Sequence, residues 1–558
     1  MKNFLAHRNT RLIVLIFGGL LVYAVTLVVL TGDIWFWGDD WFVFAPAYWY
    51  RPLNAYYSFA ENTQRPLQGV YWITFFELFG TNSILAQIGS LLIHACNAIL
   101  WAAAILIAFP AQRRLASAVA LFSFFMPVFA GSTYMMLMEN TRLQMLFFLL
   151  SLLAYQLWVL RGRLRWWALI FPIALYNIGT LTYEAGVLMI LAVPPLLYPV
   201  WQRYKNTENR HSDFDFWLRV FTGMGASVLI FLPVQIGLLS SVSSRRSRWI
   251  PKPDDFLAYI TQAVDSLIMP FQHLPSDAAT WIIGLAVMLA AGVILLRRAS
   301  NSEDENGSHS TSTLYLFGVG LLIFVQGGIP YFLTDVAIEN TFTLPNRIYS
   351  TGLFGIAILL ALLTRFKTAG SIISAILIGV FAMAHAGARH DWQDAAKMRE
   401  SLFASLIEQA PGVEPGTTFL FLDLQHKTGV ASVVEGVNGT QDYIRILYDD
   451  TSLRSHFMYL RTDDFENTED QEAVILSDGV VARGGWSGDP APFDSLLIFV
   501  REGDHLLLLD TLAADDTFND VPAAVLWDEN IRAIHSNPER IKSATLEELA
   551  HREQFIGR

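Results

Sequence analysis

The sequence predicts a polytopic α-helical membrane protein that ends in a soluble α/β domain. Of its 558 residues, 53% are hydrophobic and only 16% are charged. A helix needs about 20 apolar residues to cross a bilayer, and runs of that length recur up to residue 390. Residues 389–558 are acidic, with about 14 Lys and Arg against about 31 Asp and Glu. We therefore expect a transmembrane domain at 1–390 and an acidic soluble domain at 391–558.

Eleven apolar runs are candidate transmembrane helices. The first has no charge and no small-residue cleavage site, so we expect it to be retained as a span. The stretch VYWITFFELFG before residue 84 is too short to span and predicts an interfacial helix. The eleven runs are 12–31, 84–109, 115–134, 143–160, 166–182, 185–201, 218–239, 280–296, 313–332, 348–364 and 370–388.

Basic residues predict the orientation, because Lys and Arg are enriched in cytoplasmic loops. With the N-terminus inside, eleven spans place the basic loops in the cytoplasm and everything after residue 389 outside. The soluble domain is therefore expected to be extracytoplasmic. The residues expected inside are Arg113, Arg114, Arg161, Arg163, Arg165, Arg203, Lys205, Arg210, Arg297, Arg298, Arg365 and Lys367.

The C-terminal domain has the patterns of an α/β fold. The runs TTFLFLDL, SLLIFVR and HLLLLDTL are short, apolar and bounded by turn residues, as core strands are. DAAKMRESLFASLIEQA has helical spacing and ends before a Pro-Gly turn. A single cysteine, Cys96, excludes an intramolecular disulfide and a cysteine-based metal cluster. No basic region favours nucleic-acid binding.

Four acidic residues fall at outward helix ends. Asp39 and Asp40 follow the first span, whereas Glu139 and Glu184 lie in short loops with the sequences MLMEN and TYEAG. These carboxylates either line one cavity or are ordinary interfacial polar residues. Side chains of adjacent helical residues diverge by about 100°. Asp39 and Asp40 therefore predict a single carboxylate base with a helper, and not a matched pair acting on one atom.

Basic residues also occur in the outward loops, against the general rule. They are Arg65, the cluster around Arg245 and Arg246, and Arg347 in LPNRIYS. Because a guanidinium binds phosphate oxygens bidentately, these residues suit a phosphate ligand; the alternative is snorkelling to lipid headgroups.

Two further features of the sequence each allow two interpretations. His94 and Asn97 lie one turn apart within the second span, where such residues either serve the site or form hydrogen bonds between helices. The Trp and Tyr residues of 41–57 either anchor the loop in the membrane interface or stack on a sugar.

These elements resemble the GT-C superfamily of membrane glycosyltransferases, and more narrowly its protein O-mannosyltransferase-like branch with its bacterial relatives. The resemblance rests on Asp-Asp after the first span, the long loop ending in RPL, and the following LFGTNSILAQIGSLLIHACNAILW. TYEAG, with Tyr183 and Glu184, is similar to the short acidic third outer loop of that branch. PNRIYS, with Arg347 and Tyr349, is similar to its late Arg-x-Tyr element. The resemblance covers residues 1–395 and does not include the C-terminal domain.

The resemblance implies a GT-C-like helix bundle in a bacterial plasma membrane. It implies transfer of a sugar from a polyprenyl-phosphate donor to a hydroxyl of a glycan, lipid or protein on the outer face, with inversion. Asp39 matches the family's acidic residue of the first loop, and Arg347 matches its carrier-phosphate arginine, assisted by Arg245, Arg246 and Arg65. The first loop has no Asp-x-Asp, so use of a divalent cation (Mg or Mn) stays open. The alternatives are a transporter or flippase of lipid-linked glycans and a non-catalytic envelope scaffold.

Overall fold

The structure of the protein, a computed structural model, describes most of the chain. The described residues are 7–32, 34, 36, 39–56, 65–126, 139–162, 164–208, 212–239, 253–272, 277–297, 313–332, 351–424, 427–429, 431–434, 437–458, 473–482, 490–513, 516–518, 521–522 and 530–556.

The chain forms two compact units, each assembled from segments that are distant in sequence. Unit 1 contains Met1–Gly32, Phe59–Tyr71 and Leu85–His390, whereas unit 2 contains Asp33–Ser58, Trp72–Ile84 and Asp391–Arg558. The segment that follows the first helix therefore belongs with the C-terminal residues and not with the helices in between.

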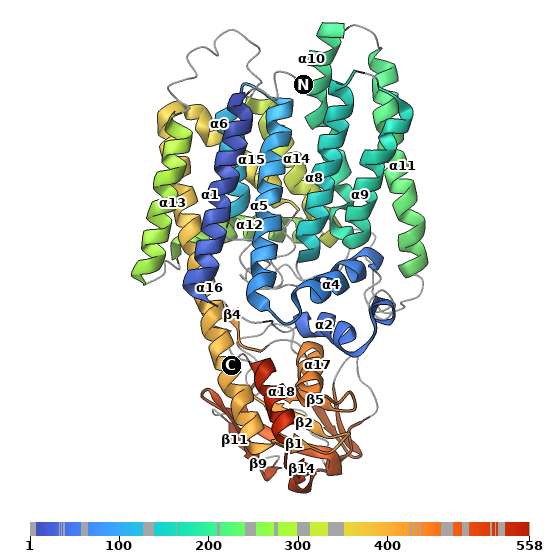
Figure 1. The fold of residues 1–558 in the computed structure, drawn as a ribbon, viewed down its shortest axis with the longest axis vertical. Helices are drawn as coiled ribbons and strands as arrows, with labels where there is room; N and C mark the ends of the chain where they lie inside the picture. The colour runs from blue at the N-terminus through green and yellow to red at the C-terminus, as the bar shows by residue number, and fades with distance from the viewer. Residues whose placement is uncertain are drawn as a thin grey trace. The chain divides into compact units, whose positions relative to one another are not determined.

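Unit 1 is a helix bundle in which consecutive long helices run in opposite directions (Figure 1). Its core is one continuous apolar cluster contributed by nearly all of these helices. Residues of α4, α5 and α16 are divided between the two units. The helices are α1 (His7–Thr31), α4 (Pro66–Phe79), α5 (Ser83–Ala108), α6 (Arg113–Phe125), α8 (Glu139–Leu160), η3 (Trp166–Leu169), α9 (Ile170–Thr182), η4 (Glu184–Ala192), α10 (Val193–Glu208), α11 (Asp213–Leu239), α12 (Pro253–Gln272), α13 (Ala278–Arg297), α14 (Thr313–Phe332), α15 (Leu353–Ala361), η7 (Leu362–Phe366) and α16 (Lys367–Gln409).

Within the described residues, eight helical runs are long and apolar enough to cross a membrane. This is consistent with a polytopic helical membrane protein. One run, Leu353–Gln409, covers both of the last two predicted spans, and Trp166–Thr182 is apolar but shorter. The span predicted at 115–134 is described only as far as Met126. The count of eleven spans therefore stays a prediction.

The last two predicted spans are separated by a tight turn at Lys367. This residue has φ 53° and ψ −126°, which is a strained conformation for a residue with a Cβ. A Cβ on Gly370 would lie 1.7 Å from the carbonyl oxygen of Leu363, so glycine is required for the two helical segments to approach. The chain consequently reverses direction between α15 and α16 (Figure 1).

Glycines also allow α14 and α15 to pack closely. A Cβ on Gly355 would lie 2.3 Å from the carbonyl oxygen of Gly320, and one on Gly327 would lie 2.3 Å from the backbone nitrogen of Gly352. Backbones that approach this closely leave no room for a larger residue, as is typical of small-residue interfaces between membrane helices.

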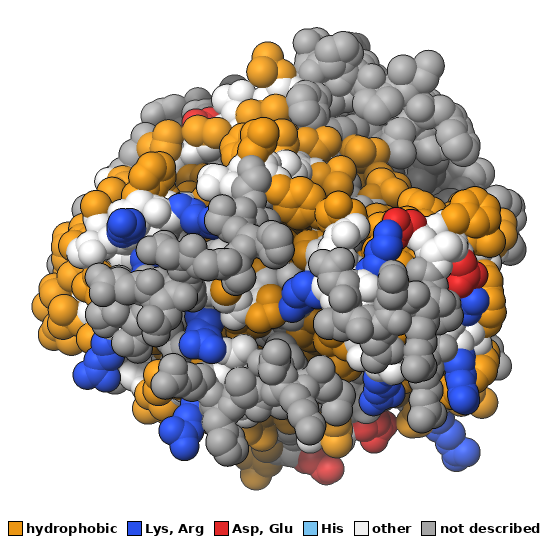
Figure 2. Space-filling view, turned by 90° about the horizontal axis from the view of Figure 1, so that it is seen from above, with side chains coloured by type: hydrophobic (Ala, Val, Ile, Leu, Met, Phe, Trp, Pro, Cys, Tyr) orange, Lys and Arg blue, Asp and Glu red, His pale blue; other side chains and the backbone are white. Residues whose placement is uncertain are grey.

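Basic side chains gather on one face of unit 1, the upper one in Figure 1. Arg113 begins α6, Lys205 lies in the last turn of α10, Arg297 ends α13 and Lys367 begins α16. Figure 2 shows Lys and Arg side chains spread over this face among hydrophobic ones. The helix ends whose loops were predicted to be cytoplasmic thus share one face, and the orientation itself stays a prediction.

Unit 2 contains a four-stranded sheet in the order β5-β2-β8-β9. Strand β2 pairs in parallel with β5 and β8, and β9 pairs antiparallel with β8. The three runs predicted as strands are β2, β8 and β9. The elements of the C-terminal segment are β1 (Gly412–Val413), β2 (Thr418–Leu422), β3 (Lys427–Thr428), β4 (Ala431–Ser432), α17 (Val437–Tyr448), β5 (Arg454–Met458), β6 (Ala473–Leu476), β7 (Gly479–Ala482), η8 (Phe493–Ser495), β8 (Leu496–Glu502), β9 (His505–Leu509), β10 (Thr511–Ala513), β11 (Thr517–Phe518), β12 (Val521–Pro522), β13 (Ala533–His535), η10 (Pro538–Arg540), β14 (Ile541–Lys542) and α18 (Leu546–Ile556).

Helix α2 (Asp39–Trp49), from the loop after the first span, packs on α17 within unit 2. The ring of Trp41 lies 4.7 Å from that of Tyr443 and 6.3 Å from that of Phe555, and Trp41 is 3% exposed. Phe44 is also buried and packs edge-on against Trp72. Trp41 is therefore a core residue of unit 2, and neither of the two predicted roles, membrane anchoring or stacking on a sugar, applies to it.

We predict that Gly355→Ala lowers the thermal unfolding midpoint of the detergent-solubilised protein, because the added methyl group overpacks the α14–α15 contact. Overpacking of this kind costs roughly 1–3 kcal/mol. Gly318→Ala on α14 is the control, because a Cβ there has no atom within 4 Å. Equal midpoints for the two variants would contradict the close approach of these helices.

Candidate functional site

Arg65 and Glu184 form a bidentate ion pair in unit 1. Arg65 donates from Nε to one carboxylate oxygen of Glu184 at 2.8 Å and from Nη2 to the other at 2.7 Å. The side chains are 19% and 37% exposed. A guanidinium has five N–H groups, and this pairing uses two of them.

The ring of Tyr183 packs against the guanidinium of Arg65. The Cζ atom of Arg65 lies 4.5 Å from the centroid of the Tyr183 ring, a cation–π arrangement. Tyr183 is the extended residue between the end of α9 and the start of η4, with φ −156° and ψ 126°. This break in the helix places Tyr183 and Glu184 against the same arginine. The structure thus brings Arg65 together with Tyr183 and Glu184, which the sequence analysis had selected from a different loop.

A buried polar face of α5 lies near Arg142 of α8. Gln87, Ser90, His94 and Asn97 are spaced by three and four residues, which places them on one side of a helix, and all four are buried. Arg142 donates to the hydroxyl of Ser90, and Asn97 donates to the backbone carbonyl of Arg142 at 2.9 Å. Asn97 therefore serves as a hydrogen-bonding partner between helices, which is one of its two predicted interpretations.

His94 contacts α6. Its Nε2 lies 3.1 Å from the carbonyl oxygen of Phe124, so this nitrogen carries the proton, and its ring stacks on the Phe124 side chain. This contact agrees with the interpretation of His94 as a partner in helix packing. The spacing of the four polar residues indicates a polar face along the helix. The sequence prediction included only His94 and Asn97 of these four.

A second buried arginine, Arg389 of α16, was missed by the sequence reasoning. It is 0% exposed and donates from Nη2 to the backbone carbonyl of Gly32 at 2.8 Å and to Oε1 of Gln87 at 2.7 Å. One turn before it, His385 lies 3.2 Å from the hydroxyl of Tyr23. Arg389 falls just after the last apolar run, where an arginine is also typical of a span end, so its position alone did not distinguish it.

Asp39 and Asp40 lie in the first turn of α2, in unit 2. Asp40 is 0% exposed, whereas the side chain of Asp39 is outside the described residues. Asp40 therefore lies in the interior of unit 2, and the roles of base and helper stay predictions. The structure assigns these aspartates and Glu184 to different units.

Several predicted site residues lie outside the described part of the chain. Arg245, Arg246, Arg347 and Tyr349 are in segments that are not described, and only the backbone of Glu139, at the start of α8, is described. Their roles stay predictions. Within the described residues, no three His, Cys, Asp or Glu side chains are grouped as metal ligands would be. The divalent cation likewise stays a prediction.

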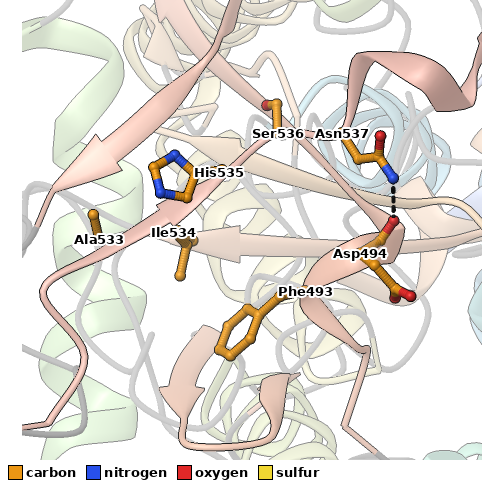
Figure 3. Close-up of a pocket in the computed structure, with 7 residues that line it drawn as sticks. All are labelled: Phe493, Asp494, Ala533, Ile534, His535, Ser536 and Asn537. Carbon is orange, nitrogen blue, oxygen red and sulfur yellow. Dashed lines mark hydrogen bonds between the residues drawn. The ribbon is translucent and has the colours of Figure 1, made fainter.

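Unit 2 has a surface pocket of about 300 Å³ at the edge of β13. Its polar side chains are occupied by local hydrogen bonds: Asn537 donates to the backbone carbonyl of Asp494 at 2.8 Å, and His535 bonds the hydroxyl of Thr511 at 2.9 Å. Ser536 accepts from the backbone of Ile498 at 2.9 Å. These hydrogen bonds stabilise the sheet edge. Figure 3 shows its lining residues, Phe493, Asp494, Ala533, Ile534, His535, Ser536 and Asn537.

No family model matches the chain, and no curated protein is significantly similar to it. The resemblance to GT-C glycosyltransferases therefore stays a prediction.

We predict that Glu184→Gln and Arg65→Lys each destabilise the protein by no more than about 1 kcal/mol, because the pair is partly exposed. Lysine cannot reproduce the bidentate geometry. A double-mutant cycle measured by thermal unfolding should give a coupling energy above that of the exposed Lys205–Asp213 pair. A coupling energy of zero would contradict the ion pair.

Asp442 of α17 makes the stability of unit 2 depend on pH. Burial raises its pKa to about 6, although the nearby Arg445 opposes this shift. The folded state then binds more protons than the unfolded state between pH 3.8 and 6, so the stabilising contribution is present at low pH and is lost as pH rises through 6.

Asp442→Asn should therefore raise the unfolding midpoint relative to the wild type at pH 7.5 and not at pH 4. At about 1.4 kcal/mol per pKa unit, the gain is roughly 1–3 kcal/mol. Asp394→Asn, whose side chain is exposed, is the control. A gain that is the same at both pH values would show that Asp442 is not the titrating group.

Proposed function

We propose that the protein transfers a sugar from a polyprenyl-phosphate donor to a hydroxyl acceptor on the outer face of the membrane, with inversion. The acceptor oxygen attacks the anomeric carbon and loses its proton to a carboxylate, for which we propose Asp39. The bond from the anomeric carbon to the phosphate oxygen breaks, and the electron pair leaves with the polyprenyl phosphate. Arginine stabilises the charge that develops on that phosphate.

The observation that carries this proposal is the Arg65–Glu184–Tyr183 cluster. Tyr183 and Glu184 directly follow the end of α9, in a loop that is on the outer side in the predicted orientation. The carboxylate and the ring fix the orientation of the guanidinium, so we propose that it loses little side-chain entropy when it binds phosphate oxygens. Arg347, Arg245 and Arg246 are proposed as further phosphate ligands on the basis of the resemblance.

Asp40 supports the proposal in a second way. Two adjacent aspartates would repel each other if both faced one cavity, and the burial of Asp40 suits a supporting role. We propose that Asp40 stabilises the first turn of α2, which contains Asp39. The sugar, the acceptor and the use of a cation are left open by this assignment.

A transporter of lipid-linked glycans is the second candidate. It is favoured by buried polar side chains inside the bundle, since intramembrane ionisable groups often line transport paths. Arg142, His94, His385 and Arg389 are all buried in unit 1. Transport across vesicles without turnover of the sugar lipid would support this candidate over the transferase.

Asp39→Asn should abolish transfer by the purified protein, lowering the rate at least about 100-fold, because an amide cannot accept the proton. Transfer is measured as release of polyprenyl phosphate from a sugar-bearing lipid extracted from the native cells. Asp394→Asn is the matched control, and expression and unfolding midpoint should be unchanged in both variants. Full activity of Asp39→Asn would remove Asp39 from the proposed role.

The donor can be identified from cells with and without the gene. We expect mass spectrometry of extracted lipids to show a sugar-bearing polyprenyl phosphate that accumulates when the gene is deleted, together with loss of that sugar from a surface glycan. Unchanged lipids and glycans would contradict the proposed function.

A further inference from the structure

Glutamine side chains are buried around η4 without adequate partners. Gln144 of α8 is 2% exposed, and neither of its amide atoms has a hydrogen-bonding partner in the described part of the chain. Gln326 of α14 is equally buried; its Oε1 has no partner there, and its Nε2 meets only the sulfur of Met189, a weak acceptor, at 3.4 Å.

The geometry of η4 places these two amides on one face. It is a 3-10 helix of nine residues, longer than such helices usually are, and in this geometry residues three apart lie directly above one another. Gly186 and Met189 therefore share a face, about 6 Å apart along the axis at 2 Å per residue. Gln144 packs on Gly186 and Gln326 on Met189, so the two amides lie on that face one turn apart.

Glycine at position 186 makes room for Gln144. A Cβ there would lie 2.0 Å from Nε2 of Gln144, so any other residue would displace the amide. A buried amide without partners costs about 1–3 kcal/mol, and an apolar residue at position 144 would avoid that cost. The sequence thus keeps polar groups at a destabilising position, two residues from the Glu184 that holds Arg65.

We propose that the amides of Gln144 and Gln326 form a recess that binds the hydroxyl groups of the sugar on the lipid-linked donor. An amide donates and accepts hydrogen bonds, as a hydroxyl does, and carries no charge, which matches a neutral polyhydroxylated group. The adjacent Arg65 provides N–H groups for the phosphate that joins this sugar to the lipid. This inference rests on the proposed function, and it adds the residues that recognise the sugar.

The test measures binding and not transfer. Thermal unfolding of the full-length protein in detergent is followed with increasing concentrations of short-chain prenyl phosphates bearing glucose, galactose, mannose or arabinose, and of sugar-free prenyl phosphate. The wild type should bind at least one sugar-bearing lipid more tightly than the sugar-free lipid. Gln144→Met and Gln326→Met should each weaken that binding about tenfold and leave sugar-free binding unchanged, as expected for loss of one or two hydrogen bonds.

A control variant separates recognition from folding. Without ligand, Gln144→Met should unfold at the same or a higher temperature than the wild type, because an unpaired amide is removed. Gln156→Met on the same helix should unfold at a lower temperature with sugar discrimination intact, because Gln156 donates to the carbonyl oxygen of Ala104 at 3.1 Å. Gly186→Ala displaces the amide without deleting it and should also lose discrimination.

The outcomes distinguish the two proposals. If the wild type prefers a sugar-bearing lipid and both Gln→Met variants retain that preference, the recess is wrong and the proposed function stands. An equal loss of sugar-bearing and sugar-free binding in these variants also overturns the recess. If the wild type distinguishes none of the four lipids from the sugar-free one, the proposed function fails and the recess with it.

Discussion

Arg142 and Arg389 are buried among apolar helices, and the polar groups of unit 1 are arranged around them. Removing a guanidinium from water is costly unless its N–H groups are satisfied, so each arginine requires oxygen atoms on neighbouring helices. Ser90 and Gln87 on α5 provide them, together with the carbonyl of Gly32 at the end of α1. These bonds fix α1, α5, α8 and α16 relative to one another, which nonspecific apolar packing does not do. Arg65 likewise has its N–H groups paired with oxygen atoms, those of Glu184 at the start of η4.

Hydrophobicity made the helical part of the chain predictable, because a run of about 20 apolar residues has few alternatives to a spanning helix. The interruption between the last two predicted spans was also foreseen, since Arg365 and Lys367 separate the two apolar runs there. Strands β2, β8 and β9 were recognisable as short apolar runs between turns. In each case the predictive pattern is local in sequence, and burial of apolar side chains dominates the free energy of folding.

Contacts between distant residues were not predictable in the same way. Glu184 and Arg65 were both selected as site residues, but no local pattern shows that they pair with each other and not with a ligand. Trp41 has the composition of an interfacial anchor, and only the position of Tyr443, some 400 residues later, makes it a core residue. The unpaired amides of Gln144 and Gln326 could not be found either, because the sequence shows which residues are polar and not which of them lack partners.

The shared core of α2, α17 and α18 has a consequence for biogenesis. Trp41 is synthesised early, but the rings that cover it, Tyr443 and Phe555, are added only as the last quarter of the chain emerges. Until then Trp41 lacks these two neighbours, and its segment, rich in Trp and Tyr, is a candidate for aggregation or chaperone binding. Because its contacts span nearly the whole chain, unit 2 is expected to fold slowly and last, after the helices of unit 1 have assembled. The core of unit 2 is therefore completed only after the last helix of the chain has been synthesised.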